Sequence, residues 1–532
     1  MKQTISILIT GFVCSNAIAQ SVTLLDPIDQ RHEHHTHQLA PVAWTHFGGS
    51  AKHHGQSNLR LSNASTTLDS PTWIAGTDDT GTSYIPLPQT GLVGDAHRIY
   101  AIATDPKTPG SSFAVAFDRF TGGFQWATPI PARVLESWST PTLDLEHQQL
   151  LIAIADELIA IDTNTGSNNW STNMSGILVN ASPIVTDDLG NRDRAFITNY
   201  SLGGGSPARL TCINVDPFDA IDNPYQPGEI VWQTALLGDS SGNTPGYAHK
   251  TVYVATAAGT GSQRGQIHAF DANATSAPSP SWTFTNTINA GFYSGLSIAR
   301  GHLYASSYSF NGLQFNSNTV KLDRATGDLV WSVPTNRTDA SPVILPSGDV
   351  IVSGGVSTTP FDFIPFFGTL PSIEFIQDSG DSASVLWDSA IETLDDANDN
   401  GTWDIGESFL SLGGWTHQPI SVTVDRSPML LVGTLDEATL SSYIGHCTDL
   451  QLVDLTKHPT DPGFVAQRFT GAGSTPAVIG SWIYTSGESG IVAFDTSPSV
   501  KLRSPDRSPQ DIVRAFLEGR ITRTQLIEQL QP

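Results

Sequence analysis

The chain has 532 residues, only 14% of them charged, and a formal net charge of −25. This charge argues against a nucleic-acid partner, because a phosphate backbone needs a basic protein face, and against electrostatic docking on anionic lipid. Gly, Pro, Ser and Thr are plentiful, which is typical of short strands joined by turns.

Residues 1–19 are predicted to be a secretory signal peptide. Lys2 supplies the positive start, Ile5 to Val13 the apolar core, and Ala17-Ile18-Ala19 the small-residue cleavage site. The core is too short to cross a membrane and no later run is long enough, so we expect an exported protein, periplasmic or secreted, without a membrane span. Cys14 raises the question of a lipoprotein, but the two residues before it are bulky, which argues against lipidation.

Residues 20–40 are predicted to form a flexible tether, within which residues 31–37 read RHEHHTH. Clustered His side chains can bind zinc, nickel or copper. Nothing around the cluster fixes a geometry, so we favour a solvated segment without a specific metal and leave metal binding open.

A repeated strand–turn–strand unit organises the next part of the chain. Its clearest copy is VKLDRATGDLVW, where Val320 and Leu322 alternate with charged neighbours, Thr326-Gly327 makes the turn and Trp331 anchors the returning strand. The copies recur mostly at about 40–55 residues, the range expected for propeller blades. Each copy is marked by one Asp: Asp118, Asp162, Asp216, Asp271, Asp323, Asp378, Asp454 and Asp495.

A second marker alternates with the first. It is a pair of small residues followed by Pro or Gly, just before an apolar run. Its copies are at residues 139–141, 181–183, 243–245, 293–295, 340–342 and 474–476. Two markers in alternation favour a repeat architecture over a generic all-β chain.

Residues 42–57, VAWTHFGGSAKHHGQS, resemble the segment that opens propellers of the pyrroloquinoline-quinone-like (PQQ-like) repeat family, through Trp44, Phe47, His54 and Gly55. The repeat core Ala-x-Asp-x-x-Thr-Gly-x-x-x-Trp resembles the same family's blade motif. The resemblance covers residues 42–496. It implies an all-β propeller of four-stranded antiparallel blades, eight of them, or seven if the degenerate copies at Asp378 and Asp454 merge.

The resemblance also implies that Thr-Gly turns join the third and fourth strands and lie on one face. Turns between the second and third strands, and the links between blades, then lie on the opposite face. The longest insertions belong to that opposite face: residues 104–111, 201–207, 256–265, 307–318, 356–371 and 434–446. Because loops on rigid scaffolds carry binding function, we expect the working surface there.

One of these loops is rich in Phe, from Phe361 to Phe367. Exposed, it would form an apolar patch of the kind that marks a partner or ligand site. Folded inward, it would plug the central channel or cover a blade. We leave both interpretations open.

The segment DANDNGTWDIGE, from Asp396 to Glu407, matches the spacing of an EF-hand-like calcium loop within an insertion at 392–410. The expected ligands are Asp396, Asn398, Asn400, Thr402 through its carbonyl, Asp404 and Glu407. A single loop on an exported propeller favours a structural calcium site over a sensor. The alternative is an acidic, Asn-rich turn without metal.

Two cysteines remain after signal cleavage, Cys212 in the third repeat and Cys447 in the seventh. These blades lie far apart in a ring, so we expect two free thiols. Residues 497–507 are predicted to be a linker. Residues 508–532 are predicted to be a short helical tail, capped by Ser508-Pro509.

Two functions are consistent with these features, whereas a third, a hydrolase or lyase, has no nucleophile motif or spaced carboxylate pair to support it. The favoured one is a monomeric, exported, non-catalytic propeller that binds a protein or ligand through its long-loop face. The alternative is a quinoprotein oxidoreductase of alcohols or sugars. The resemblance implies that this enzyme would hold its quinone at the centre, on a Trp floor, beside calcium and a basic carboxylate. The family's alcohol dehydrogenases carry adjacent cysteines, and this sequence has none. We therefore expect no quinone and no catalytic residues.

Overall fold

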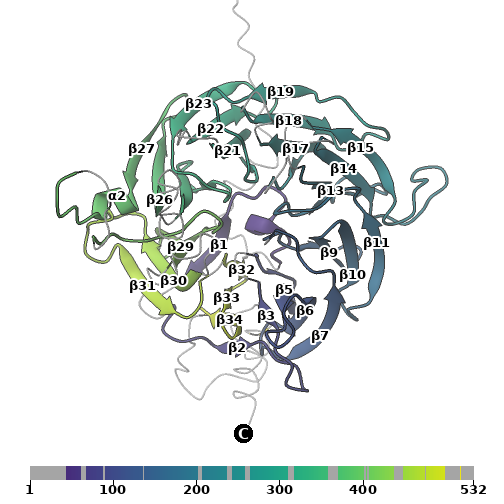
Figure 1. Ribbon diagram of the computed structural model, residues 1–532, viewed down its shortest axis with the longest axis horizontal. Helices are drawn as coiled ribbons and strands as arrows, with labels where there is room; N and C mark the ends of the chain where they lie inside the picture. The colour runs from purple at the N-terminus through teal and green to yellow at the C-terminus, as the bar shows by residue number, and fades with distance from the viewer. Residues whose placement is uncertain are drawn as a thin grey trace, which may run out of the picture. The chain divides into compact units, whose positions relative to one another are not determined.

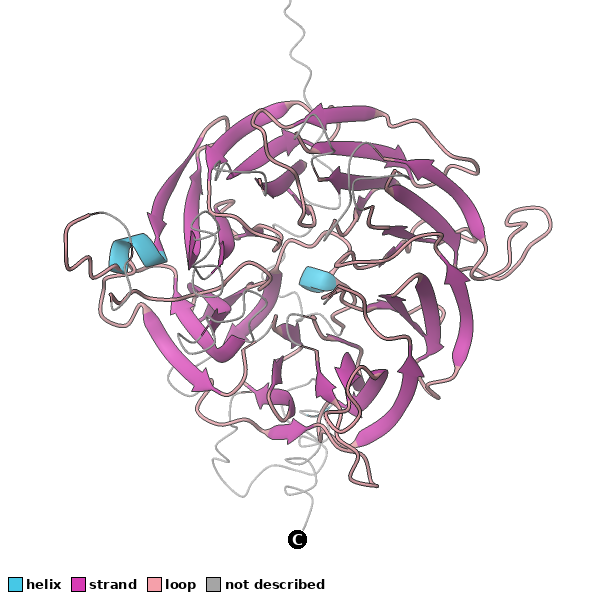
Figure 2. Ribbon diagram, in the orientation of Figure 1, coloured by secondary structure: helices cyan, strands magenta, loops and turns pink. Residues whose placement is uncertain are grey.

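Eight antiparallel sheets stand around a common axis in the computed structural model (Figures 1 and 2). The structure describes residues 43–61, 67–87, 90–135, 137–201, 207–236, 243–257, 264–309, 317–356, 369–400, 403, 407–435, 447–473, 475–497 and 516. The described sheets all lie within one compact unit, residues 39–532. The expectation of an eight-bladed propeller is confirmed.

The first four blades follow one another along the chain. Blade 1 contains β3 (Ile85–Pro86), β4 (Val93–Gly94), β5 (Arg98–Thr104), β6 (Ser112–Asp118) and β7 (Phe124–Ile130). Blade 2 contains β8 (Thr142–Asp144), β9 (Gln149–Ile154), β10 (Glu157–Asp162) and β11 (Asn168–Asn173). Blade 3 contains β12 (Ile184–Val185), β13 (Arg194–Thr198), β14 (Arg209–Asn214) and β15 (Ile230–Ala235). Blade 4 contains β16 (Gly246–Ala248), β17 (Thr251–Thr256), β18 (Gln266–Asp271) and β19 (Trp282–Thr285).

The remaining blades continue the same order. Blade 5 contains β20 (Ser297–Ala299), β21 (His302–Tyr308), β22 (Ser317–Asp323) and β23 (Leu329–Pro334). Blade 6 contains β24 (Val343–Ile344), β25 (Val350–Val356), β26 (Thr369–Asp378) and β27 (Ala383–Asp388), followed by helix α2 (Ser389–Thr393). Blade 7 contains β28 (Ile420–Val424), β29 (Ser427–Leu435), β30 (Cys447–Asp454) and β31 (Val465–Thr470).

Blade 8 is built from both ends of the propeller. It contains β32 (Ala477–Ile479), β33 (Trp482–Gly487) and β34 (Gly490–Asp495), and its outer strand is β2 (Trp73–Ala75), antiparallel to β34. Two further N-terminal elements, the 3-10 turn η1 (Phe47–Gly49) and β1 (Gln56–Leu61), lie inside the ring (Figure 1). β1 pairs in parallel with β28 of blade 7. The N-terminal residues therefore close the ring and also line its axis.

The repeated Asp and Gly explain why each Thr-Gly hairpin forms. In every blade but the third, the third strand ends at the predicted Asp. Its carboxylate accepts hydrogen bonds from the turn's backbone, as from Thr121 N to Asp118 Oδ1 at 2.9 Å. Gly166 in blade 2 has φ +74°, which a residue with a Cβ rarely adopts.

The repeated Trp joins each blade to the next. An added Cβ on Gly166 would lie 2.8 Å from the ring of Trp126 in blade 1, and the Trp126 indole N–H donates to the Thr163 carbonyl at 3.0 Å. In blade 8, whose repeat has no Trp of its own, Trp73 of β2 takes this place, against Gly122 of blade 1. The same contact joins Trp170 to Gly228 and Trp282 to Gly327, so Trp and Gly pack together at four of the blade junctions.

Two repeat copies depart from the pattern. In blade 3 the strand ends at Asn214, whose carbonyl receives the Gly228 N–H, so Asp216 is not the residue that closes this hairpin. In blade 6 the turn after Asp378 places Gly380 in open space rather than under a Trp. An ion pair replaces that contact, because Lys321 Nζ of blade 5 lies 2.7 Å from Asp378 Oδ2.

The predicted difference between the two faces holds only in part, because the third-to-fourth-strand connections of blades 3, 4 and 7 are also long, the longest at residues 215–229. Long loops separate the second and third strands in six blades, whereas blades 2 and 8 have short turns, between Ile154 and Glu157 and between Gly487 and Gly490. The links between blades lie on the same face as the long loops. We call it the loop face. The face with the third-to-fourth-strand turns is the turn face.

We expect Trp73→Ala to lower the free energy of unfolding by about 2–4 kcal/mol, because it removes the ring that holds blade 8 against blade 1. Its neighbour Ile74 is 52% exposed on the same strand, so Ile74→Ala is the matched control. Denaturant unfolding monitored by circular dichroism measures both. Equal effects of the two substitutions would show that the Trp73 indole does not hold blade 8 against blade 1.

Candidate functional site

Residues 44–55 form a strap that runs around the inside of the ring and meets the blades in order. Successive backbone N–H groups of the inner strands donate to it. The bonds run from Leu143 to Thr45 O (2.8 Å), Tyr247 to Ala51 O (2.9 Å), Ile298 to Lys52 O (2.8 Å), Ile344 to His54 O (3.0 Å) and Ser421 to Gly55 O (2.8 Å). Trp44 exchanges two such bonds with Gly94 of blade 1. The segment that resembles the family's opening stretch is therefore an axial strap.

Two buried His side chains hold the strap. Val185 N of blade 3 donates to His46 Nε2 at 3.2 Å, and His53 Nδ1 lies 3.2 Å from the Leu296 carbonyl, to which it donates. Burial lowers the pKa of His46 to about 4 and that of His53 to about 3. Both imidazoles are therefore neutral in the folded protein near neutral pH.

The second sequence marker forms a ring of hydrogen bonds around the axis. In five of the links before inner strands, a backbone N–H donates to a side chain of the next link. The bonds run from Gly91 to Thr140 Oγ1 (2.9 Å), Thr140 to Ser182 Oγ (2.8 Å), Ser182 to Thr244 Oγ1 (3.0 Å), Ser341 to Gln418 Oε1 (2.8 Å) and Gln418 to Thr475 Oγ1 (3.4 Å). The marker therefore exists because a short polar side chain must reach the neighbouring blade.

Above this ring, the links bring aromatic side chains together at the centre of the loop face, which we call the axial mouth. Trp415, from the link between blades 6 and 7, lies 6.4 Å from Trp138 in the link between blades 1 and 2. Tyr308 meets Trp415 edge-on at 5.5 Å, and Tyr293 stacks on Tyr308 at 4.4 Å. Blades far apart in the sequence thus share one aromatic cluster.

Charged side chains lie within the same mouth. Asp339 is 5% exposed and Arg337 is 3% exposed, both in the link between blades 5 and 6. Burial raises the pKa of the Asp339 carboxyl to about 7, and hydrogen bonding with Tyr308 and Trp415 offsets part of that rise. Burial lowers the pKa of Arg337 to about 10. Sequence reasoning missed this cluster, although Trp138 and Asp339 each directly precede a copy of the second marker and Tyr293 begins one.

The calcium-loop residues lie after helix α2, which begins where Asp388 Oδ1 caps Ala390 N and Ile391 N. Ala397 N donates to Glu407 Oε1 at 2.8 Å, and Asn400 N donates to Asp396 Oδ1 and Asn398 Oδ1, both at 3.1 Å. The first and last acidic residues of the loop are thus tied to its backbone. Four of the six expected ligands are described, whereas Thr402 and Asp404 lie outside the described residues.

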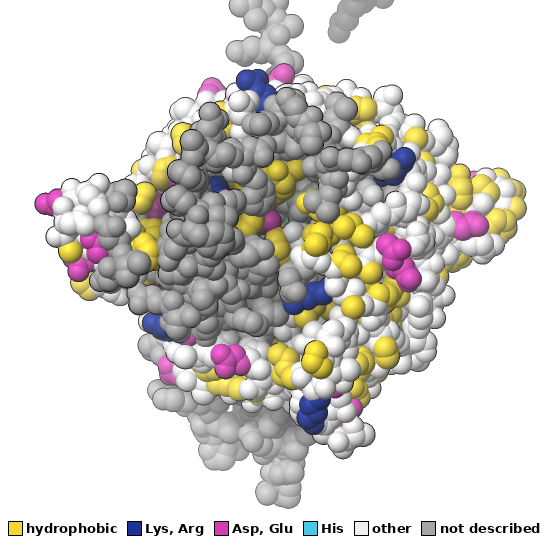
Figure 3. Space-filling model, in the orientation of Figure 1, with side chains coloured by type: hydrophobic (Ala, Val, Ile, Leu, Met, Phe, Trp, Pro, Cys, Tyr) yellow, Lys and Arg dark blue, Asp and Glu magenta, His cyan; other side chains and the backbone are white. Residues whose placement is uncertain are grey.

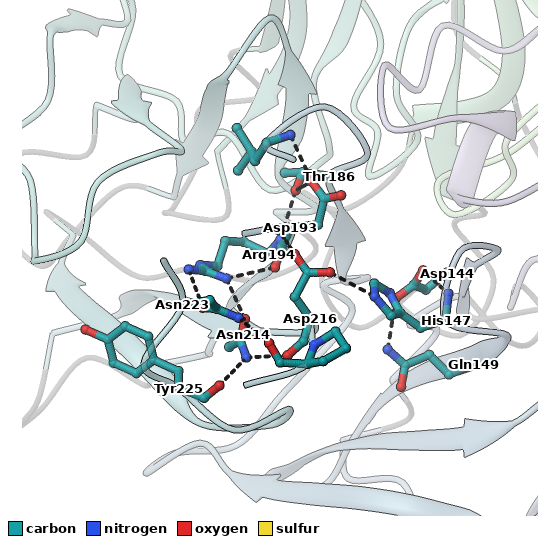
Figure 4. A network of polar contacts seen from close by, with 12 residues as sticks. Asp144, His147, Gln149, Thr186, Asp193, Arg194, Asn214, Asp216, Asn223 and Tyr225 are labelled. Atoms are coloured by element: carbon teal, nitrogen blue, oxygen red, sulfur yellow. Dashed lines mark hydrogen bonds and ion pairs between the residues drawn. The ribbon is translucent and has the colours of Figure 1, made fainter. Parts of the chain in front are cut away.

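A polar network joins blades 2 and 3 on the turn face (Figure 4). His147 Nδ1 lies 2.8 Å from Asp144 Oδ2 and its Nε2 lies 2.9 Å from Asp216 Oδ1. The hydrogen bond with Asp144, helped by the charge of Asp216, raises the pKa of His147 to about 9. Asp216, which the repeat predicted at a strand end, instead links two blades through a charged imidazole.

Some of the remaining sequence predictions fall on described residues, and others do not. Cys212 is buried on β14 without a disulfide, as expected, and burial raises its pKa. The side chain of Cys447 is outside the described part of the chain, and so are the signal peptide, the His-rich tether and the Phe361 to Phe367 loop. The predicted helical tail is described only at residue 516, which is helical. No described helix is long and apolar enough to span a membrane.

The described rings of the mouth offer no pair of parallel, separated surfaces between which a flat quinone would be sandwiched. Trp415 is met edge-on by Tyr308, with an interplanar angle of 83°, and Trp138 is tilted from it by 60°. The parallel pair Tyr293 and Tyr308 is in direct contact, which leaves no gap.

Comparison with known sequences places the repeats. Residues 219–401 match the model of a family described as outer membrane protein assembly factor BamB. These residues carry PQQ-like propeller repeats. The match includes the clear copy around Val320 and confirms the resemblance stated from the motifs. No curated protein sequence matches the chain.

Solved PQQ-like propellers share the fold. Quinohemoprotein alcohol dehydrogenase from Comamonas testosteroni aligns with a TM-score of 0.54 at 12% identity, over 89% of this chain and 84% of that one. A europium-containing methanol dehydrogenase aligns at 0.52 and 11%, over 86% and 91%. BamB from Moraxella catarrhalis aligns at 0.47 and 17%, over 77% and 95%. At these identities the likeness is one of fold.

We expect acid to weaken the strap through His46 and His53. The unfolded chain takes up a proton on each near pH 6.5, whereas the folded chain resists until about pH 4 and about pH 3. Their contribution to stability is complete above pH 6.5 and is lost as the pH falls. At pH 5 the loss is about 2 kcal/mol for each His.

Difference profiles isolate this effect, because burial raises the pKa values of Asp339 and Glu374 and gives them the opposite pH dependence. The stability gap between wild type and His53→Gln, measured by denaturant unfolding, should shrink by about 2 kcal/mol from pH 7 to pH 5. His97→Gln, at an exposed site, is the control. A constant gap for His53→Gln would contradict a neutral, buried imidazole.

Proposed function

We propose that the chain is an exported, non-catalytic propeller that binds a protein partner or ligand through its loop face, with a structural calcium site in the 392–410 insertion. The observation that carries the proposal is the aromatic axial mouth at the centre of the loop face. Six blades also have second-to-third-strand connections of seven residues or more. Binding function gathers on loops that a rigid scaffold positions.

The composition of the described surface supports binding by shape and apolar contact. In Figure 3, hydrophobic side chains are spread over the described part of the visible face, and Lys and Arg side chains are scattered singly among them. At the mouth, Trp138 and Tyr293 are partly exposed above buried neighbours. Trp and Tyr are enriched among the residues that dominate binding energy at protein interfaces.

The likeness to a family described by BamB supports a scaffold role. That description names an outer membrane protein assembly factor, and an exported binding propeller would be of the same kind. The predicted signal peptide agrees with export. The fold shared with alcohol dehydrogenases does not itself imply an activity, because one fold hosts many functions.

The geometry around α2 supports the calcium part of the proposal. Asp396 and Glu407 lie at the two ends of the loop, and both accept hydrogen bonds from its backbone. Glu407 is 9% exposed, so its carboxylate is held near the loop rather than in solvent. Carboxylate and amide oxygens at alternate positions suit a cation that takes six to eight hard ligands.

Calcium removal should therefore destabilise the loop. We expect EGTA to lower the melting temperature of the calcium-loaded protein by several degrees and Asp396→Ala to abolish the sensitivity, since calcium stabilises only the state it binds. Asp381→Asn, on an exposed turn of blade 6, is the matched loss of one carboxylate. An unchanged melting temperature in wild type with EGTA would refute the site.

The quinoprotein alternative is tested by titration calorimetry of the apo protein with pyrroloquinoline quinone and calcium, separately and together. We expect heat from calcium and none from the quinone. Quinone binding that requires calcium would reverse the proposal and call for screening of alcohols and sugars as substrates.

The partner surface is tested by cross-linking in the exported fraction of the source cells. Trp138→Ala should weaken the cross-linked species several-fold, because Trp138 lies on the loop face. Ile221→Ala is the control, since Ile221 is 90% exposed on a third-to-fourth-strand turn of the opposite face. Loss with Ile221→Ala but not with Trp138→Ala would move the binding surface to the turn face.

A further inference from the structure

Asp339 is the most unusual charged group at the axial mouth. It lies in the link between β23 and β24, where its backbone N–H donates to the Trp415 carbonyl at 2.8 Å. Its side chain is 5% exposed overall, and Oδ1 has no hydrogen-bond partner among the residues that the structure describes. A carboxylate in this setting is costly unless a partner satisfies it.

The surroundings explain what kind of partner would satisfy this oxygen. Burial is the main influence on the pKa of Asp339, which it raises to about 7, and the influences that lower the pKa are hydrogen bonds rather than a positive charge. Hydrogen bonds therefore satisfy part of the carboxylate, while Oδ1 has no partner among the described residues. A cation would supply the missing charge.

The aromatic rings indicate which kind of cation the mouth would bind. Tyr308 and Trp415 hydrogen-bond with the Asp339 carboxylate, and the ring of Trp138 lies 6.4 Å from that of Trp415. Aromatic faces attract organic cations, and Trp does so most strongly. A calcium ion instead needs six to eight oxygens, whereas the described residues of the mouth offer one buried carboxylate, that of Asp339, beside aromatic rings and Arg337. The surroundings favour an ammonium group over an inorganic ion.

We propose that the axial mouth binds an alkylammonium group, with the Asp339 carboxylate as its counter-ion and Tyr308, Trp415 and Trp138 as its aromatic walls. The proposal rests on the proposed function and specifies the ligand chemistry at the centre of the loop face. Trp138 and Tyr293, which contact Trp415 and Tyr308, are partly exposed to solvent. The ammonium can belong to a free amine or to a lysine side chain of a partner.

Choline and its neutral isostere 3,3-dimethyl-1-butanol test the charge requirement directly, because they have the same shape. Titration calorimetry of the full chain should show binding of choline at least about ten-fold tighter than that of the alcohol. The second probe is Nα-acetyl-lysine amide, which keeps its side-chain ammonium. Stronger binding of the lysine compound indicates a protein partner, and stronger binding of choline indicates a small quaternary amine.

Two substitutions assign the binding to this site. Asp339→Asn keeps the shape of the side chain and removes its charge, so it should weaken choline binding at least about ten-fold. Trp415→Phe keeps a ring with a weaker face and should weaken binding by a smaller factor. Asp381→Asn, on the turn face of blade 6, should leave choline binding unchanged. Melting curves confirm that each variant is folded.

The outcomes separate this inference from the broader proposal. No binding of either ammonium probe, equal binding of choline and its neutral isostere, or undiminished choline binding by folded Asp339→Asn would overturn the cation site. The cross-linking result with Trp138→Ala is independent of those probes. If the loop-face partner is retained but no ammonium probe binds, the proposal of a binding propeller stands and the proposal of a cation site fails.

Discussion

Hydrogen bonding between the axial strap and the inner strands is the interaction on which the rest of this structure depends. Each inner strand is short and forms the edge of its sheet, with backbone N–H groups that need acceptors. The strap supplies acceptors in turn as it passes the blades. His46 and His53 fix it by using ring nitrogens where a carbonyl or a donor is required. One segment of chain is thus hydrogen-bonded to seven of the eight sheets around their common centre.

Two further sets of contacts hold the blades at different distances from the axis. Near the centre, short polar side chains such as Thr140 and Ser182 reach the neighbouring link. At the periphery, Trp rings pack on the bare Gly of the next hairpin, as Trp126 does on Gly166. Neither set uses the second-to-third-strand loops. Those loops are therefore free to differ in length without disturbing the ring, which is why binding residues can accumulate on one face.

The sequence predicts the parts of this design that are local and repeated. Asp, Thr-Gly and Trp recur because each hairpin needs a capping carboxylate, a positive φ and a ring. Trp73 could not be assigned in this way, because its partner strand β34 lies at the other end of the propeller. Gln418 accepts the hydrogen bond that Ser or Thr accepts in other links, so a pattern of small residues does not detect it. Asp339 was missed because its importance comes from burial, which no local spacing encodes.

The composite blade 8 has a consequence for how the molecule comes together. The chain emerges from synthesis with β2 and the strap first, and the strand that pairs with β2 last. Blades 1 to 7 are formed from consecutive strands and can assemble through local pairing. The ring closes only through the contact of longest sequence separation, which is intrinsically slow to form. Until then the edges of β2 and β34 are unpaired and can pair with strands of other chains. Aggregation is therefore most favoured before the propeller closes.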